Sequence, residues 1–227
     1  MSFADKLTAA RTIARANPDD VAHFADAPVG NIVDAIGRTG AMDLAIKPTT
    51  QAQTFSGSAL TVNAGPRDNL APWAALRLAQ PGDVMVIATG GHKEASVLGD
   101  LLIGMAKNAG IVAIVTDGVI RDISGANAVG IPVFAAGVSP NSPQKNGPGA
   151  VGLPMVAGGV AISSGDILCG DEDGVVVIPS GQIAQAKSAL AAVREKEAAM
   201  EKAVAAGATA PGWIADLPLD QVFTFVD

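Results

Sequence analysis

The middle of the chain alternates short apolar runs with segments of helical periodicity. Four apolar runs bounded by turn residues predict buried strands: 57–62, 84–88, 111–116 and 131–135. Between them, residues 69–79 and 96–108 place apolar side chains at helical spacing, and Gly110 follows the second segment as a stop signal. Strands and helices that alternate over short connections predict crossovers with at least partly parallel pairing.

The ends of the chain carry helical patterns. Residues 3–16 have apolar positions at roughly helical spacing, and the Asn17-Pro18 pair ends the pattern. A second short helix is predicted at 29–37, and a long Ala-rich amphipathic helix at 182–206. The tail that follows, residues 207–227, is expected to pack on a neighbouring molecule.

A β-rich stretch follows the predicted crossovers. A polar loop at 137–149 contains three Pro and three Gly and is long enough to be a functional loop. After it come short apolar runs that predict strands separated by turns: 155–162, 166–169 and 175–178. We expect a single domain over residues 1–227, with an N-terminal helical segment at 1–28.

The composition is acidic and poor in aromatic residues, His and Cys. With 15 Lys+Arg against 22 Asp+Glu the formal net charge is -7, and aromatic residues make up 4% of the chain. We expect no nucleic-acid partner, because neither a basic surface nor stacking rings are available. His23, His92 and Cys169 are the only imidazoles and thiol, which excludes closed zinc sites, iron–sulfur clusters and disulfides. Any metal must be held mainly by oxygens, which favours Mg²⁺ or Mn²⁺.

The N-terminal sequence gives no sign of membrane targeting. Residues 1–20 alternate charged with small side chains and contain no apolar stretch long enough for a signal peptide or a membrane span. We therefore expect a cytoplasmic protein without a membrane partner.

Candidate chemistry begins at the predicted helix 96–108. Its first turn contains Gly99, Asp100, Leu101 and Leu102. Backbone N–H groups there lack intrahelical acceptors and the helix dipole favours an anion, so a substrate carboxylate can dock on them. The glycine also allows a ligand to approach the backbone closely.

The next predicted strand is followed by Asp117-Gly118 and then by Arg121-Asp122. An arginine offers a planar fork for a carboxylate or enolate oxygen, and the adjacent aspartate can bind a hard divalent cation. Taken singly, each feature has an ordinary interpretation. Asp100 can be a helix-dipole partner, an Asp-Gly pair a turn, and an Arg-Asp pair a solvated surface pair. The combination is more specific than its parts.

The combination resembles the class II pyruvate aldolases, a family that contains 4-hydroxy-4-methyl-2-oxoglutarate/4-carboxy-4-hydroxy-2-oxoadipate aldolase and the regulator of ribonuclease activity A. The resemblance is carried by Arg67-Asp68-Asn69, Gly99-Asp100-Leu101-Leu102, Arg121-Asp122, the Pro/Gly loop, Gly165-Asp166 and the run 171–179. Twenty residues separate Asp100 from Arg121, and this spacing is the most discriminating element. The resemblance covers about Val29 to Gly207. It has one departure, because Ser96 stands where the family often has Gly.

The resemblance implies a role for each matching residue. Asp122 would be the one direct protein ligand to Mg²⁺ or Mn²⁺, and Arg121 would contact the keto or enolate oxygen. Asp100 would hold a metal-bound or catalytic water. The carboxylate of the pyruvyl group would be received by backbone amides near Gly99, Leu101 and Leu102.

The resemblance also implies the fold and the assembly. The family fold is a three-layer α/β/β swivelling-domain arrangement with a mixed β-core, assembled as trimers or dimers of trimers. A glutamate from the C-terminal helix of a neighbouring subunit would complete each site, and Glu197 is the best match, with Glu195 as the alternative. A solvated helix face is the ordinary interpretation of such a charge run.

The implied activity is a metal-dependent carbon–carbon lyase. A small anionic 2-oxo acid with a 4-hydroxyl group would be cleaved to pyruvate and a second 2-oxo acid. Oxaloacetate decarboxylation passes through the same pyruvate enolate, so one site can serve both reactions.

Other interpretations of the chemistry remain open from the sequence. A Schiff-base aldolase would need a buried lysine, for which Lys93, Lys107 and Lys145 are the candidates. Lys145 can instead guard the site or bind a distal carboxylate. His92 can be an acid or a substrate contact, and Cys169 is best interpreted as a small core residue. A non-catalytic protein that binds and masks a ribonuclease assembly is the alternative function, although it predicts loss of residues that this chain retains.

Overall fold

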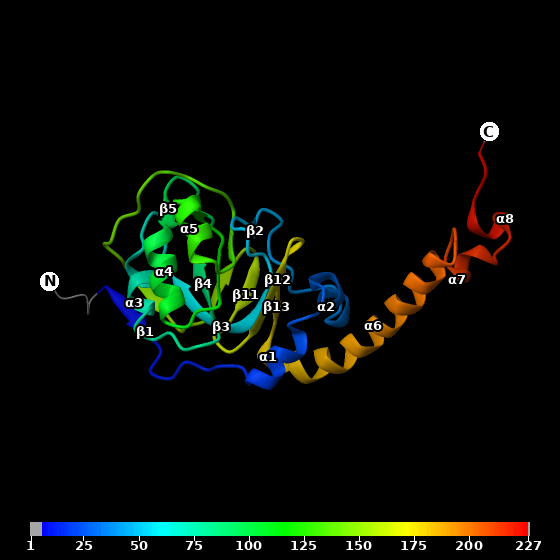
Figure 1. Cartoon of the computed structure of the whole chain (residues 1–227), viewed down its shortest axis with the longest axis horizontal. Coiled ribbons are helices and arrows are strands. Elements are labelled where there is room, and N and C mark those ends of the chain that lie inside the picture. The colour runs from blue at the N-terminus through cyan, green and yellow to red at the C-terminus, as the bar shows by residue number, and fades with distance from the viewer. Residues whose placement is uncertain (1–5, 227) are drawn as a thin grey trace.

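The computed structural model describes residues 6–226 and consists of an α/β body from which one long helix projects (Figure 1). The centre of the body is a mixed sheet of nine strands. Its middle strands are parallel in the order β3 (Phe55–Asn63), β4 (Asp83–Ala88), β6 (Ala113–Thr116) and β8 (Val133–Ala135). These strands are almost continuously apolar because both faces of the sheet are covered. The predicted crossovers and parallel pairing are confirmed.

The remaining strands extend the sheet or form small sheets of their own. Strands of the large sheet outside the parallel centre are β1 (Leu7–Ala9), β2 (Lys47–Pro48), β9 (Gly149–Val151), β12 (Ile167–Asp171) and β13 (Gly174–Ile178). The pair β10 (Met155–Ala157) and β11 (Val160–Ile162) forms an antiparallel hairpin, and β5 (Ser96–Leu98) pairs with β7 (Val119–Ile120) in parallel.

Helices and hairpins cover the sheet in layers. One face packs against α3 (Leu70–Ala75), α4 (Asp100–Asn108) and α5 (Ile123–Val129). The other face packs against the β10–β11 hairpin. Outside the β12–β13 pair lie α1 (Pro18–Phe24), α2 (Val29–Ala35) and the first turns of α6 (Ile183–Ala205). This arrangement confirms the three-layer α/β/β fold with a mixed β-core.

The C-terminal part of the chain extends away from the body (Figure 1). A 3-10 turn at Ser180–Gln182 leads into α6, and two short helices follow, α7 (Gly212–Ala215) and α8 (Leu219–Val222). The long helix predicted at 182–206 is confirmed. Within residues 6–226, no helix is both long enough and apolar enough to cross a membrane.

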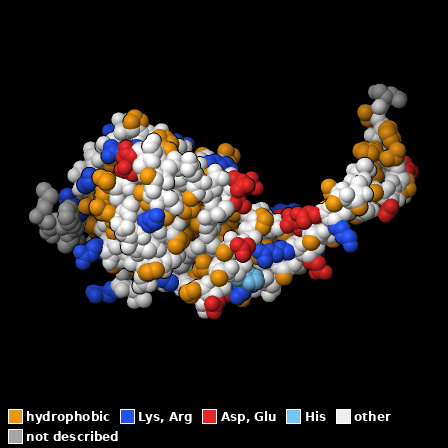
Figure 2. Space-filling view, in the orientation of Figure 1, with side chains coloured by type: hydrophobic (Ala, Val, Ile, Leu, Met, Phe, Trp, Pro, Cys, Tyr) orange, Lys and Arg blue, Asp and Glu red, His pale blue; other side chains and the backbone are white. Residues whose placement is uncertain are grey.

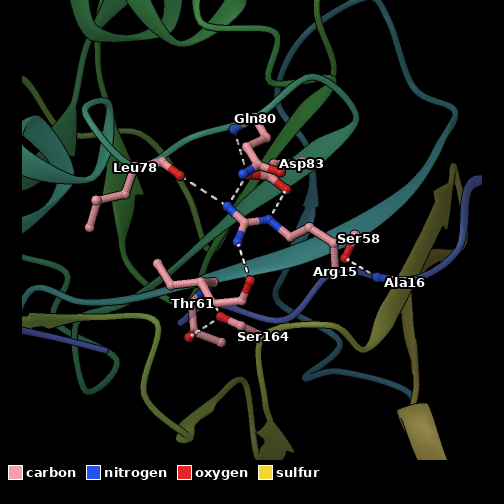
Figure 3. A network of polar contacts seen from close by, with 9 residues as sticks. Arg15, Ala16, Ser58, Thr61, Leu78, Gln80, Asp83 and Ser164 are labelled. Carbon is pink, nitrogen blue, oxygen red and sulfur yellow. Dashed lines mark hydrogen bonds and ion pairs between the residues drawn. The ribbon is translucent and has the colours of Figure 1, made fainter. Parts of the chain in front are cut away.

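The helix predicted at 3–16 is wrong over the part that the structure describes; residues 3–5 lie outside it. Residues 7–9 form β1, which pairs in parallel with β9, and no helix precedes α1 in the described chain. Arg15 holds the following segment against the sheet, since its guanidinium binds both carboxylate oxygens of Asp83 at 2.7 and 2.9 Å and donates to the carbonyl of Leu78 (Figure 3). Strand pairing and this ion pair outweigh a helical pattern made largely of alanines.

The start of the central helix also differs from the prediction. Residues 96–98 form β5 instead of the first helical turn, and α4 begins at Asp100 with Gly99 as its N-cap. The reason is a tertiary one, because β7, the partner of β5, lies some twenty residues further along the chain. The helix predicted at 69–79 is likewise shorter, since α3 ends at Ala75.

Candidate functional site

The two motifs of the site meet because β5 and β7 are parallel neighbours. Leu98 is paired with Ile120, and the amide of Arg121 donates to the carbonyl of Leu98 at 3.1 Å. Both strands end there, so Gly99-Asp100 and Arg121-Asp122 leave the same edge side by side. The pairing of β5 with β7 therefore brings together two motifs that are separated by twenty residues in the sequence.

A small cavity of about 120 Å³ lies at this edge. It is lined by six of the predicted site residues: Gly99, Asp100, Leu101, Leu102, Arg121 and Asp122. Its other walls come from Asn69 and Trp73 at α3 and from Ser142, Pro143 and Lys145 in the long loop. The structure thus brings together every predicted site residue except Glu197.

Two glycines allow the carboxylates of the site to approach the backbone. A Cβ atom at Gly99 would collide with Asp122 Oδ2 and would lie 3.3 Å from Arg121 Cγ. A Cβ atom at Gly125 in α5 would collide with the carboxylate of Asp100. A larger residue at either position would force the carboxylate side chain that it meets to move, because that side chain occupies the space that a Cβ would need.

Asp122 has a left-handed backbone, with φ 59° and ψ 45°, and serves as the N-cap of α5. Aspartate is one of the few residues other than glycine that tolerates this conformation, which is often found at functional sites. Arg121 Nε donates to Asp122 Oδ2 at 3.1 Å, and Arg121 Nη1 donates to Ser142 Oγ at 2.6 Å. The guanidinium is therefore fixed between the metal-ligand candidate and the long loop.

The first turn of α4 offers donors for an anion. Within the described chain, the amides of Asp100, Leu101 and Leu102 have no acceptor, whereas Ile103 donates to the carbonyl of Gly99 at 3.2 Å. No side chain caps this end of the helix. Free N–H groups and the helix dipole together favour a carboxylate at this point.

The long loop is fastened over the cavity by buried groups. Asp68 Oδ2 accepts from the amides of Asn146 at 2.5 Å and Gly147 at 3.1 Å. Ser96, which is fully buried, donates to the carbonyl of Asn141 through its amide at 3.0 Å and its hydroxyl at 2.6 Å. The departure from the family pattern at Ser96 therefore provides an anchor for this loop.

Sequence reasoning missed three wall residues, Asn69, Trp73 and Ser142. Asn69 belongs to a motif of the resemblance that implies no role for it, and an apolar aromatic residue such as Trp73 in a predicted helix is typical of a core position. Ser142 lies in the polar loop, whose conformation depends on Asp68 and Ser96 and has no local signature. Lys145, by contrast, lines the cavity. This position agrees with the interpretation that Lys145 guards the site or binds a distal carboxylate.

The oxygen donors of the cavity are compatible with a divalent cation. Among residues 6–226, no three His, Cys, Asp or Glu side chains form a group that could hold a metal. Asp122 and Asp100 both line the cavity, and the Asp122 side chain is 44% exposed. A hard cation that keeps most of its shell as water and substrate needs no more than such carboxylates. Asp122 fits the role of a single ligand to Mg²⁺ or Mn²⁺.

Glu197 lies elsewhere in the protomer. It is exposed on α6 and lines a separate cavity of about 610 Å³ beside α2, where it accepts a hydrogen bond from Asn31 Nδ2. Glu195 is also exposed on α6. Neither glutamate lines the cavity of Asp100 and Arg121 in the same protomer.

The remaining candidates from the sequence do not line this cavity; they are Lys93, Lys107, His92 and Cys169. Lys107 Nζ donates to the carbonyl of Val129 at 2.5 Å, and Lys93 is exposed. His92 follows the Gly90-Gly91 turn, and within the described chain its buried Nε2 has no hydrogen-bond partner. Burial raises the pKa of the Cys169 thiol to about 12, which agrees with a core residue.

Comparison with known proteins identifies the family. The RraA-like family, described as Aldolase/RraA, matches residues 29–177. A Halalkalibacterium halodurans protein named "Putative 4-hydroxy-4-methyl-2-oxoglutarate aldolase" is 36% identical over 170 residues, covering 75% of this chain and 81% of its own.

Two solved structures share the fold. An uncharacterized protein from Pseudomonas syringae pv. tomato has a TM-score of 0.76 at 25% identity, covering 86% of this chain and 96% of its own. The RNA-processing inhibitor RraA from Thermus thermophilis has a TM-score of 0.63 at 27% identity, covering 68% and 93%. The chain therefore belongs to the RraA-like family, as the resemblance in its sequence predicted.

Proposed function

We propose that this protein is a divalent-metal-dependent lyase that cleaves a 4-hydroxy-2-oxo dicarboxylic or tricarboxylic acid to pyruvate and a second 2-oxo acid. The observation that carries the proposal is the meeting of Arg121, Asp122, Asp100 and the free amides of α4 in one small cavity. The aldolase name of the relative from H. halodurans supports the same reaction class.

Each group of the cavity has a task in this reaction. The amides of Leu101 and Leu102 bind the carboxylate next to the keto group, and Arg121 directs its guanidinium at the keto oxygen. When bound at Asp122, the divalent cation supplies a Lewis acid for the keto group. A water held by Asp100 accepts the proton of the 4-hydroxyl group.

The bond between C3 and C4 then breaks. The 4-hydroxyl carbon becomes the carbonyl of the second oxo acid, and the electron pair of the bond forms the pyruvate enolate. Arg121 stabilises the negative oxygen that exists only as the bond breaks, which is how a fixed cation accelerates a reaction. Protonation at C3 by the water at Asp100 releases pyruvate. Oxaloacetate reaches the same enolate by loss of carbon dioxide.

We further propose that the sites are shared between subunits of a homotrimer or homohexamer. Within one protomer Glu197 lines a different cavity from Arg121, so it can contribute to catalysis only in the site of a neighbouring subunit. The exposed position of Glu197 on the projecting helix α6 supports such an arrangement (Figure 1).

Oxaloacetate decarboxylation tests the role of Arg121. With Mg²⁺ present, we expect wild-type protein to release pyruvate and Arg121→Ala to lose about 100-fold or more in kcat, as the loss of a fixed oxyanion donor typically does. Arg77→Ala is the matched control, because Arg77 is exposed just beyond the end of α3 and does not line the cavity. Equal rates in the two variants would refute the site.

The alternative function is protein binding that inhibits a ribonuclease. The relative from T. thermophilis is named an RNA-processing inhibitor, which supports this alternative. Release of no pyruvate from oxaloacetate or from 4-hydroxy-2-oxo diacids, with or without Mg²⁺ or Mn²⁺, would favour this alternative.

A further inference from the structure

One wall of the cavity carries polar atoms that no described residue satisfies. Asn69 Oδ1 and Trp73 Nε1 are both buried and have no hydrogen-bond partner in the described chain, and both residues line the cavity. Asn69 is only 5% exposed. Buried polar groups in native proteins are nearly always paired, so an unpaired donor and acceptor at a cavity wall indicate a ligand or ordered water.

We propose that Trp73 determines the substrate specificity of this site by donating its indole N–H to the distal carboxylate of the substrate. This inference rests on the proposed function, because that function assigns the other polar groups of the cavity. The α4 amides receive the carboxylate beside the keto group, and Arg121 and Asp122 serve the keto oxygen. The unassigned polar groups of the lining, on Asn69, Trp73 and Lys145, are then left for the other end of the substrate.

The chemistry of this wall suits a second carboxylate. The indole N–H is a donor only, and the lysine ammonium adds a positive charge without a described salt-bridge partner. The Asn69 amide can turn to present either its oxygen or its NH₂ group. A substrate that ends in a methyl group would leave the indole N–H unpaired, and such unpaired groups are what make hydrogen-bonding sites selective.

The wall is also held firmly in place. The amide of Asn69 donates to the carbonyl of Gln144 at 3.0 Å, and the amide of Trp73 donates to the carbonyl of Asn69 at 3.3 Å. Trp73 packs against the main hydrophobic core. The loop and the core therefore both position the indole. The same hydrogen bond from Asn69 also holds the loop next to Lys145, because its acceptor is the carbonyl of Gln144.

A binding experiment tests the proposal without turnover. The probes are 2-oxoglutarate and 2-oxopentanoate, which have the same chain length and differ only in the distal carboxylate. With Mg²⁺ present, we expect calorimetry to show wild-type protein binding 2-oxoglutarate at least about tenfold more tightly, as a hydrogen bond to a charged group typically provides. In Trp73→Phe this preference should fall at least about fivefold. Trp213→Phe makes the same change at an exposed position and should keep the preference.

Fluorescence supplies a second readout that leaves the cavity unchanged. Trp73 and Trp213 are the two tryptophans of the chain, so in Trp213→Phe all indole emission comes from Trp73. Saturation with 2-oxoglutarate should shift this emission more than saturation with 2-oxopentanoate does. An unchanged emission, or an undiminished preference in Trp73→Phe, would overturn the proposal and would indicate that the indole pairs with Asn69 instead.

The outcome also separates this inference from the proposed function. If Trp73 discriminates between the two probes but no variant or wild-type protein releases pyruvate, the subsite stands and the lyase reaction fails. If pyruvate is released and Trp73 makes no difference to the probes, the reaction stands and the subsite fails.

Discussion

At the scale of single residues, the site depends on two glycines that lack side chains as much as on its charged residues. Gly99 and Gly125 leave room for the carboxylates of Asp122 and Asp100, and Asp122 itself has a left-handed backbone. The carboxylates are therefore placed by backbone shape rather than by a large set of hydrogen bonds. A methyl group at either glycine would displace the side chain that it meets.

Gly99→Ala tests this dependence. The added Cβ must push aside Asp122 and the stem of Arg121, so we expect at least a 100-fold loss of pyruvate release with a folded protein by circular dichroism. Gly104→Ala is the matched control in the same helix, since its nearest neighbour would be Val129 at 3.8 Å. This control should retain activity and gain up to about 1 kcal/mol in stability. Full activity in Gly99→Ala would show that Asp122 need not occupy its described position.

At the scale of elements, the sequence predicts what is local and misses what depends on distant pairing. The parallel centre, the β-hairpin and α6 follow from apolar runs, turn residues and helical spacing. Residues 96–98 form a strand only because β7 lies beside them, and residues 7–9 only because β9 does. The meeting of Asp100 with Arg121 was predictable from a family spacing, whereas the wall formed by Trp73 depends on how α3 packs under the long loop.

One ion pair holds the N-terminal segment between β1 and α1 in place. Arg15 binds a carboxylate whose side chain is 1% exposed, and the amide of Ala16 donates to Ser58 Oγ at 2.9 Å (Figure 3). Arg15→Met should lower the free energy of unfolding by about 3 kcal/mol, because it leaves Asp83 buried without its cation. Denaturant titration checks the value, with the exposed Arg11→Met as a control expected within about 0.5 kcal/mol of wild type. Equal stabilities of the two variants would contradict this role.

At the scale of the whole molecule, the main feature outside the α/β body is a projecting C-terminal arm. The arm comprises α6 beyond Leu190, α7, α8 and the chain to residue 226, and Figure 2 shows hydrophobic side chains gathered at its far end. Its large apolar residues are mostly exposed: Trp213, Leu217, Leu219, Phe223 and Phe225. Exposed apolar surface of this kind is typical of a protein–protein interface.

Subunit mixing tests whether Glu197 completes a neighbouring site. Asp122→Ala and Glu197→Gln should each be nearly inactive alone. After joint unfolding and refolding, mixed oligomers should regain roughly a quarter of wild-type activity, because some sites then combine an intact Asp122 with an intact Glu197 from another subunit. Refolded single variants are the controls. No recovery in an oligomer shown to be mixed would place Glu197 outside the site.

Metal-dependent release of pyruvate from 4-hydroxy-4-methyl-2-oxoglutarate is the most direct test of the central claim. The site predicts steady pyruvate formation with Mg²⁺ or Mn²⁺, its loss on chelation, its return when the metal is added back, and at least a 100-fold reduction in Asp122→Ala. Cleavage that continues at the same rate under chelation and in Asp122→Ala would contradict the account.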